Sequence, residues 1–314
     1  MSAELPTLPQ RAGDLSIPDL IDIYMRHYAG RDPTRLQRLS WWSTRLSGRT
    51  LQDLSDDDVH AALEDLAQQH SRYFAGKDAD NKPIYKAKRK PLAPATINRY
   101  GASLAAVVTW AIKRRVAPRG YVHPCRSVER RAENNEKTRF LSDAEREALL
   151  AACKASSWPR LYVLVLMALT TGARKGELVG LRWGDVDFDR SIAHVGRTKN
   201  GDPRVLPLVP AVADELRRFE GARGALVFPS LRNPDLPFGF EPRWHIALKA
   251  AGIRHFTFHA LRHSCASMLA QNGATLLEIA DVLGHRQLQV TKRYSHLATG
   301  HKAALVNRVL GGIK

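Results

Sequence analysis

The stretch Thr257-Phe258-His259-Ala260-Leu261-Arg262-His263 is the most informative part of this 314-residue sequence. If Thr257 caps a helix, His259 and Arg262 lie three positions apart on one helical face, so both side chains can reach a single anionic group. Taken alone, the histidine is equally well a satisfied helix residue and the arginine a surface ion-pair partner. The interpretation therefore depends on what surrounds this stretch.

Further chemistry-bearing residues stand on both sides of it. In Leu283-Gly284-His285, the glycine can end a helix and present the histidine from a turn, and Tyr294 follows nine residues later. Far upstream, Arg174 comes directly after Gly172-Ala173. Arginine forks match phosphate oxygens, and histidines exchange protons near neutral pH. A tyrosine hydroxyl, with a pKa of roughly 10, needs such neighbours before it can attack. The set indicates phosphoryl chemistry without a metal.

A metal site is the competing interpretation of the same region. His255, His259 and His263 stand at i, i+4 and i+8, with Cys265 nearby, and helical His-x3-His pairs can bind zinc. The predicted cap leaves His255 outside the helix, however, and Arg262 places a cation beside the ion. We therefore expect no metal and no other cofactor, and we interpret His263 as a packed or hydrogen-bonding residue.

The charge balance indicates a polyanionic partner. Lys plus Arg number 48 against 31 Asp plus Glu, which gives a formal net charge of +17. A surface this basic repels itself unless phosphates neutralise it. By itself the charge fits nucleic acid or an anionic membrane equally well.

Length and composition predict an ordinary soluble protein of about two domains. Residues are 44% hydrophobic and 25% charged, and the longest apolar run, Leu161 to Leu169, is too short to span a membrane. Residues 1–20 show no signal-peptide pattern, and three cysteines are too few and too scattered for a disulfide framework. We expect a cytoplasmic protein.

Pattern shifts along the chain predict its domains. Residues 1–14 form a loose tail, 15–118 a helical domain, 119–136 a basic linker and 137–314 a second domain. Within the first domain, residues 70–94 interrupt the helical pattern and are expected to form an exposed basic loop. Eight cations of this loop, the following helix end and the linker are candidate contacts to a phosphate backbone: Lys86, Lys88, Arg89, Lys90, Arg114, Arg115, Arg130 and Arg131.

The second domain is predicted to be helical with one small antiparallel sheet. Ser142 starts its first helix with a capping-box spacing. Residues 192–197 and 204–208 are expected to be two strands around the turn Asn200-Gly201. The predicted fold class is therefore mainly α.

These motifs, in this order, resemble the tyrosine recombinases of the phage-integrase type. Thr171–Glu177 is similar to the box of the first catalytic arginine, and Thr198–Gly201 to the hairpin that carries the catalytic lysine. The stretch His259–His263 resembles the box of the second histidine and arginine. Leu283-Gly284-His285 and Tyr294 resemble the last histidine and the nucleophile.

The resemblance implies an enzyme that breaks and rejoins DNA strands. Tyr294 would form a 3′-phosphotyrosine intermediate, so neither ATP nor metal is required. Its predicted helpers have distinct roles: Arg174, Arg262 and His285 stabilise the transition state, Lys199 protonates the leaving oxygen, His259 assists proton transfer or orients the phosphate, and Glu177 supports the Arg174 region, a role that a structural salt bridge fills equally well.

The resemblance also implies an architecture and partners. The first domain would be the core-binding domain and the second the catalytic domain, which together clamp double-stranded DNA. Four protomers would meet at a synapse, a free protein would be monomeric, and directionality or DNA-bending factors would assist. A C-terminal helix at Ala303 to Val309 would be exchanged between protomers, or would pack on its own domain. The expected location is the bacterial cytoplasm, at the nucleoid.

Four functions remain as alternatives. An integrase of a prophage or other mobile element is favoured by the interruption at 70–94 and the divergent first domain. A recombinase that resolves chromosome dimers is the runner-up. A DNA-binding factor without strand transfer explains the charge but leaves the ordered motifs unexplained. A type IB topoisomerase has similar active-site groups but does not require paired sites.

Overall fold

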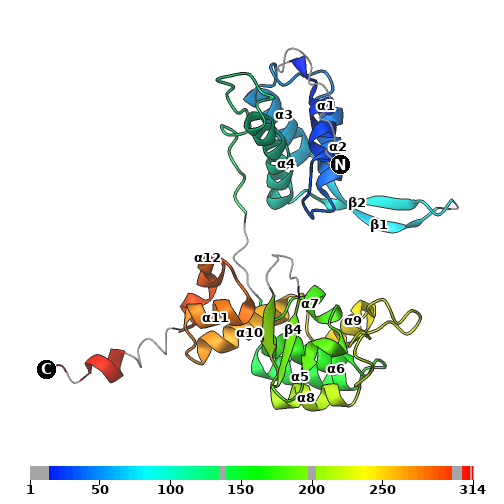
Figure 1. Cartoon of the computed structure of the whole chain (residues 1–314), viewed down its shortest axis with the longest axis vertical. Helices are drawn as coiled ribbons and strands as arrows, with labels where there is room; N and C mark the ends of the chain where they lie inside the picture. Colours follow the sequence, from blue (N-terminus) through cyan, green and yellow to red (C-terminus); the bar gives the residue numbers. More distant parts are fainter. Residues whose placement is uncertain are drawn as a thin grey trace. The chain divides into compact units, whose positions relative to one another are not determined.

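The computed structural model describes residues 14–78, 80–133, 139–196, 203–298, 306–311 and 313. Its internal contacts divide the chain into two compact units, Met1–Asn135 and Glu136–Lys314 (Figure 1). The expectation of a mainly helical chain with a small antiparallel sheet in the second domain is confirmed, and the first unit contains a second, two-stranded sheet that was not predicted. Among the described residues, no helix is both long and apolar enough to cross a membrane.

Unit 1 is a bundle of helices with a two-stranded ribbon. Its described elements are α1 (Ile17–Arg26), α2 (Arg35–Arg45), α3 (Asp56–Ala67), β1 (His70–Lys77), β2 (Pro83–Pro91) and α4 (Pro94–Lys113). Helix α4 packs against α1, α2 and α3. Its residues Leu104, Val107 and Val108 lie at helical spacing and are fully buried, together with Trp42 of α2. The apolar stripe of α4 therefore organises the core of this unit.

Local sequence signals set the ends of these helices. Ser55 caps α3 with a capping box, in which its hydroxyl oxygen accepts from the backbone N–H of Asp58 and the Asp58 carboxylate accepts from the backbone N–H of Ser55. Helix α4 begins at Pro94. Proline is well suited to a first helical turn because its missing N–H would have had no partner there.

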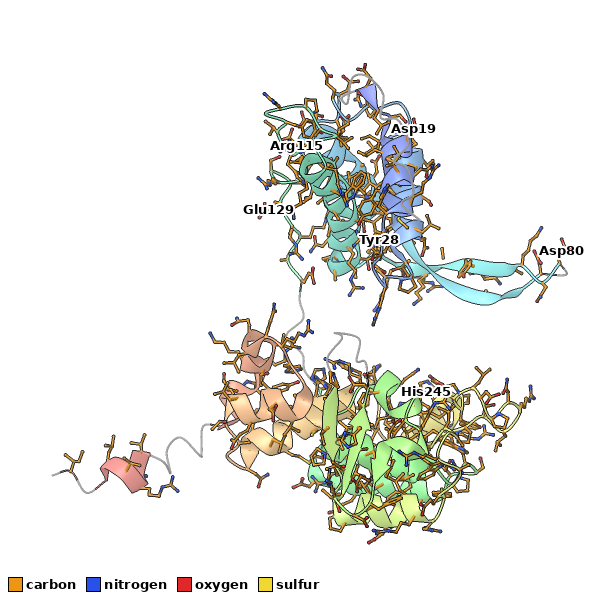
Figure 2. The ribbon with its side chains drawn as sticks, viewed as in Figure 1. Asp19, Tyr28, Asp80, Arg115, Glu129 and His245 are labelled. Atoms are coloured by element: carbon orange, nitrogen blue, oxygen red, sulfur yellow. The ribbon has the colours of Figure 1, made fainter. Side chains whose placement is uncertain are left out.

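The loop expected at residues 70–94 is wrong, because most of it forms an antiparallel hairpin. Strands β1 and β2 pair along their length and project from the helices of the unit (Figure 1). At the tip, the carboxylate of Asp78 accepts hydrogen bonds from the backbone N–H groups of Asp80 and Lys82, and Figure 2 shows Asp80 at this end. The prolines that suggested a loop, Pro83 and Pro91, stand at the two ends of β2, where a strand tolerates them.

Residues 116–133, most of which fall in the expected linker, pack against the helices of unit 1. The buried ring of His123 lies with Nε2 3.1 Å from Oγ1 of Thr109 on α4. Asn98 exchanges two hydrogen bonds with the backbone of Arg131, at 2.8 and 3.0 Å. This segment is therefore fixed to unit 1 as far as the described residues reach.

Unit 2 is a helical domain that carries a three-stranded sheet. Its described elements are α5 (Asp143–Lys154), α6 (Leu161–Thr171), α7 (Lys175–Val179), the 3-10 turn η2 (Trp183–Asp185), β3 (Val186–Asp187), β4 (Ile192–Val195), β5 (Arg204–Pro207), α8 (Pro210–Arg217), α9 (Glu241–Ala250), α10 (Ala260–Gln271), α11 (Leu276–Leu283), α12 (Leu288–Thr291) and η3 (Lys292–Ala298). Helix α6 is apolar on all sides and packs against α5, α7, α8 and α10. It is the centre of the core of this unit.

The sheet has the order β3-β4-β5, and its neighbouring strands are antiparallel. Strands β4 and β5 confirm the two predicted strands, although both are shorter than expected. Strand β3 was not predicted, because two residues carry no recognisable alternation. The predicted turn at Asn200-Gly201 lies outside the described residues.

The helices that carry the motifs begin and end close to the predicted positions. Thr257 accepts a hydrogen bond from the backbone N–H of Ala260, as a cap would, but the regular helix α10 starts only at Ala260 with His259 as its N-cap residue. Thr275 caps α11, and Gly284 ends it in the left-handed conformation at φ 65°. Residues 306–310 are helical, whereas 303–305 of the predicted terminal helix lie outside the described residues.

Candidate active site

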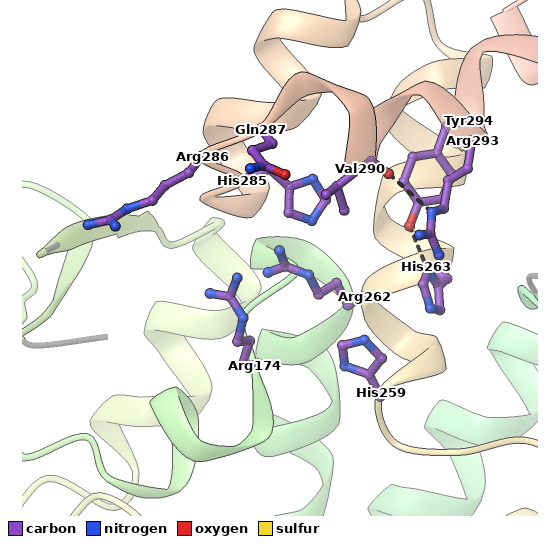
Figure 3. A pocket seen from close by; sticks show the side chains of 10 residues that line it. All are labelled: Arg174, His259, Arg262, His263, His285, Arg286, Gln287, Val290, Arg293 and Tyr294. Carbon is purple, nitrogen blue, oxygen red and sulfur yellow. Dashed lines mark hydrogen bonds between the residues drawn. The ribbon is translucent and has the colours of Figure 1, made fainter. Parts of the chain in front are cut away.

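A cavity of about 490 Å³ in unit 2 brings together residues from four separate parts of the sequence (Figure 3). It is lined by Arg174, His259, Arg262, His263, His285, Arg286, Gln287, Val290, Arg293 and Tyr294. Five of the six predicted catalytic residues are in this set. The sixth, Lys199, lies outside the described residues.

The turn after α6 positions Arg174. Gly172 ends the helix at φ 59°, and a Cβ there would lie 2.3 Å from Cδ2 of Leu283, so only glycine fits. Arg174 then precedes α7, and its Nη1 donates to Oε1 of Glu177 at 2.7 Å, while its backbone N–H donates to Oε2 at 2.9 Å. Glu177, predicted as a support, thus holds both the backbone and the guanidinium of Arg174.

Arg262 presents an unused donor to the cavity. Its Nη1 donates to the carbonyl oxygen of Gly172 at 2.7 Å, which ties α10 to the turn that carries Arg174. Its Nη2 is buried and has no hydrogen-bond partner among the described residues. Burial, together with the cations Arg174 and Arg204, lowers the pKa of Arg262 to about 10, so the group remains a cation at neutral pH. An anion in the cavity would satisfy Nη2.

His285 follows the C-cap residue of α11, and its imidazole ring is held in the neutral form. Its Nδ1 lies 2.8 Å from Oγ1 of the buried Thr291, which orients the ring. Burial and then the charges of Arg262 and Arg174 lower its pKa to about 4. At neutral pH it therefore offers an uncharged ring to the cavity beside two guanidinium groups (Figure 3).

Tyr294 is buried, and its hydroxyl is engaged. Only 2% of the residue is exposed, and its Oη lies 2.6 Å from Nδ1 of His263 (Figure 3). Burial raises the pKa of the phenol, although the cations Arg293 and Arg262 oppose this effect. His263 was predicted as a packed or hydrogen-bonding residue, and the sequence did not indicate that Tyr294 would be its partner.

His259 stands at the start of α10 and completes a row of rings. Its ring centroid lies 5.2 Å from that of His263 in an edge-on arrangement. Burial and the charges of Arg262, Arg174 and Arg293 lower its pKa. His259, His263 and Tyr294 therefore follow one another along the wall of the cavity.

Arg204 does not line the cavity but stabilises segments that border it, a role that was not predicted. Its guanidinium donates to the carbonyl oxygens of Leu283 at 2.7 Å and Val282 at 2.5 Å, and lies 3.3 Å from Glu177 Oε2. These carbonyls belong to the end of α11, where a cation also complements the helix dipole. Arg204, the first residue of β5, thus connects this strand to the end of α11 and to Glu177 of α7.

Arg286 and Arg293 also line the cavity and were missed by the sequence interpretation. Each stands next to a predicted catalytic residue, after His285 and before Tyr294, and this adjacency was the available signal. The described residues that line the cavity thus include four arginines and no carboxylate. Such a cavity suits a phosphate group. Within the part of the chain that the structure describes, no group of three or more His, Cys, Asp or Glu side chains is arranged to hold a metal.

The predicted backbone contacts lie on unit 1 in two kinds of setting. Lys86, Lys88, Arg89 and Lys90 are exposed along β2, and Arg114 and Arg115 are exposed after α4. Arg130 pairs with Glu133 at 3.4 Å, and Arg131 pairs with Glu64 at 2.5 Å. The hairpin and helix-end cations are the more available of the eight.

Comparison with known proteins identifies the family. Residues 139–301, just over half of the chain, match the phage integrase family. This match contains every predicted catalytic residue, including Lys199. The chain therefore belongs to the phage integrase family of tyrosine-type site-specific recombinases.

Individual relatives agree with this assignment. The integrase of Salmonella phage P22 is 25% identical over 287 residues, which cover 84% of this chain and 71% of that protein. The type 1 fimbriae regulatory protein FimE of Escherichia coli K12 is 32% identical over 186 residues, 55% of this chain and 92% of that protein. A solved structure of the Tn1549 transposon integrase with circular-intermediate DNA has a TM-score of 0.70 at 19% identity, over 94% of this chain and 99% of that one, which shows the shared fold.

Proposed function

We propose that this protein cuts and rejoins double-stranded DNA at specific sites through a 3′-phosphotyrosine intermediate formed by Tyr294. The observation that carries this proposal is the single cavity into which Arg174, Arg262, His285 and Tyr294 converge from four separate motifs. A tyrosine beside an anion site with unused cationic donors is the arrangement that phosphoryl transfer to tyrosine requires.

Each side chain then has a part in the reaction. Arg174 and the unpartnered Nη2 of Arg262 bind the non-bridging oxygens of the scissile phosphate and stabilise the charge that develops there. Neutral His285 adds a hydrogen bond from its ring. The Tyr294 oxygen bonds to phosphorus while the bond to the 5′-oxygen breaks, and Lys199 supplies the proton that this oxygen needs. Rejoining reverses these steps, so no ATP and no metal take part.

Glu177 acts through its partners rather than on the DNA. Its carboxylate is buried and receives hydrogen bonds from Arg174 and Arg204, so it has no free face for a substrate. We assign it the role of positioning Arg174 in the cavity. Replacing Glu177 is therefore expected to affect cleavage only indirectly, through the position of Arg174.

We further propose that unit 1 is the core-binding domain and that its hairpin contacts the DNA backbone. Lys86, Lys88 and Lys90 are exposed and lie within a five-residue stretch of β2, although the pairing with β1 is irregular between Ala87 and Pro91. Cations in such a row neutralise successive phosphates, and a two-stranded ribbon also fits the major groove. With a net charge of +17, the chain is suited to a duplex rather than to a small anionic substrate.

At the synapse we expect a homotetramer that exchanges the C-terminal helices, assembled from free monomers with the help of directionality or DNA-bending factors. The described part of this helix leaves Val306, Val309 and Leu310 exposed, which a neighbouring protomer would cover. The proposed place of action is the cytoplasm, at the nucleoid.

Integration of a prophage or another mobile element is the favoured role. The P22 phage integrase matches this chain over 84% of its length, which includes most of unit 1 as well as unit 2. Resolution of chromosome dimers is the second candidate, because the tyrosine recombinase XerC of Corynebacterium efficiens is 28% identical over 65% of the chain. A recombination assay in a host separates the two roles. An integrase should recombine the paired ends of the element, whereas a dimer-resolving recombinase should recombine two copies of a chromosomal site.

The test of the reaction is the formation of a covalent adduct. The protein would be incubated in EDTA with duplexes that span the ends of the element carrying the gene, each nicked so that the cleaved 5′-hydroxyl strand is lost. We expect an SDS-resistant adduct with the native protein and none with Tyr294→Phe, whose DNA affinity should be retained. Tight binding without an adduct would leave a DNA-binding factor on a recombinase fold.

A further inference from the structure

The hydrogen bond between Tyr294 and His263 has no place among the roles assigned above. The Tyr294 Oη lies 2.6 Å from Nδ1 of His263, and both residues line the cavity. A nucleophile and a base within hydrogen-bond reach of each other are the structural mark of an activated hydroxyl.

The surroundings of His263 keep its ring neutral. On its own helix it faces His259 and Arg262, and from η3 it faces Arg293 and Tyr294. Burial, the neighbouring His259 and the two arginines lower its pKa to about 4. A neutral imidazole carries a hydrogen on one nitrogen and a lone pair on the other. With the lone pair on Nδ1, the buried hydroxyl of Tyr294 donates to it.

We propose that His263 is the general base of the reaction and takes the phenolic proton of Tyr294 as the tyrosine attacks the scissile phosphate. This inference rests on the proposed function. The O–H bond of Tyr294 breaks and an N–H bond forms at Nδ1, while the tyrosine oxygen bonds to phosphorus and the bond to the 5′-oxygen breaks. That oxygen receives its proton from Lys199. In rejoining, the histidine returns its proton to the tyrosine oxygen.

The same surroundings make activation depend on bound DNA. In the empty cavity, protonated His263 would face the positive charges of Arg262 and Arg293. A phosphodiester in the cavity brings a negative charge against these arginines and offsets their effect on the ring. His263 therefore becomes a competent base once the phosphate is in place, and Tyr294 stays protonated and buried until then.

The variant His263→Asn separates proton transfer from positioning. An asparagine amide oxygen can accept the hydrogen bond near the position of Nδ1, but it cannot take the proton at neutral pH. We expect single-turnover adduct formation to slow by about 10²–10⁴-fold, the usual contribution of a general base. The matched control is His245→Asn, the same change on the exposed face of α9 (Figure 2), which should cleave at the native rate.

A second substrate distinguishes the base from the general acid. When sulfur replaces the bridging 5′-oxygen, the leaving group needs no proton. Lys199→Ala should therefore be slow on the oxygen substrate and recover on the sulfur substrate, whereas His263→Asn should remain slow on both. The His263→Asn rate should also rise about tenfold for each pH unit as hydroxide replaces the missing base, because the phenol then ionises before attack. The native rate should be flat around neutral pH.

Three outcomes would overturn the inference. These are native-rate cleavage by His263→Asn, its recovery on the sulfur substrate, or a nitrogen-15 NMR spectrum of the free protein that places the hydrogen of His263 on Nδ1 instead of Nε2. The NMR measurement needs no DNA, so it tests the inference even if no site is cleaved. An adduct that survives Tyr294→Phe would instead refute the proposed function itself.

Discussion

Replacing Glu177 with glutamine removes a buried negative charge that two guanidinium groups share. The side chain of Glu177 is 6% exposed, that of Arg204 10% and that of Arg174 26%. Glutamine preserves the shape, but its amide hydrogens point toward donors instead of accepting from them. Arg204 then remains buried as a cation that has lost its ion-pair partner.

The expected loss of stability is about 3–5 kcal/mol, the range found when one partner of a buried ion pair is removed. The three hydrogen bonds that Glu177 accepts are all charge-assisted, and Arg204 cannot move into solvent as Arg174 can. A loss of about 3 kcal/mol changes the folding equilibrium of unit 2 by more than about 100-fold. Adduct formation should slow as well, because Arg174 loses its fixed orientation.

Urea denaturation followed by circular dichroism, fitted with a separate transition for each unit, measures this loss. The double variant Glu177→Gln with Arg204→Met should regain most of it, because the buried cation is then gone. The control is Glu215→Gln on α8, whose exposed pair with Arg218 should contribute less than about 1 kcal/mol. If Glu177→Gln costs no more than this control, or if Arg204→Met restores nothing, the assigned network is wrong.

Three other perturbations test different parts of the structure. Gly172→Ala should destabilise unit 2 by about 2–5 kcal/mol, from a left-handed alanine and the clash with Leu283, and a urea midpoint equal to that of the native protein would contradict this. The cavity histidines His263 and His285 have pKa values of about 4 in the folded protein and about 6.5 when unfolded, so the unfolded state takes up protons first as the pH falls. Their contribution to stability should therefore be complete above about pH 6.5 and decline as the pH falls toward 4. Thermal denaturation across this pH range checks the direction of the change. The double variant His263→Phe with His285→Phe should show a weaker dependence of stability on pH. Changing Lys86, Lys88 and Lys90 to glutamine should flatten the dependence of log affinity on log salt concentration by about 0.9 for each phosphate that these lysines neutralise, and an unchanged slope would remove the hairpin from the DNA interface.

Much of the fold was predictable from local signals. The capping boxes at Ser55 and Ser142 and the glycine end of α11 depend on a few adjacent residues, so the sequence alone indicates them. The β1–β2 hairpin was missed because the prolines at the two ends of β2 look like loop signals. Pairing across a turn is not visible in the pattern of either strand alone.

The site residues that belong to short sequence motifs could be predicted. The contacts that depend on packing between distant parts of the chain could not. Arg174, Arg262, His285 and Tyr294 were named from short motifs, and the fold brings them to one cavity. Arg204 at the start of β5 resembles a solvent-exposed cation in sequence, because its carbonyl partners at 171 and 282–283 lie far along the chain. The partner of His263 depends in the same way on how η3 packs on α10.

The most direct test of the account is to locate the covalent link. The adduct would be trimmed with nuclease, digested with a protease and sequenced by mass spectrometry. The account predicts a nucleotide joined through its 3′-phosphate to the peptide that contains Tyr294. A nucleotide on any other residue, or a link through a 5′-phosphate, would contradict the assignment of Tyr294 as the nucleophile in a cavity built from Arg174, Arg262 and His285.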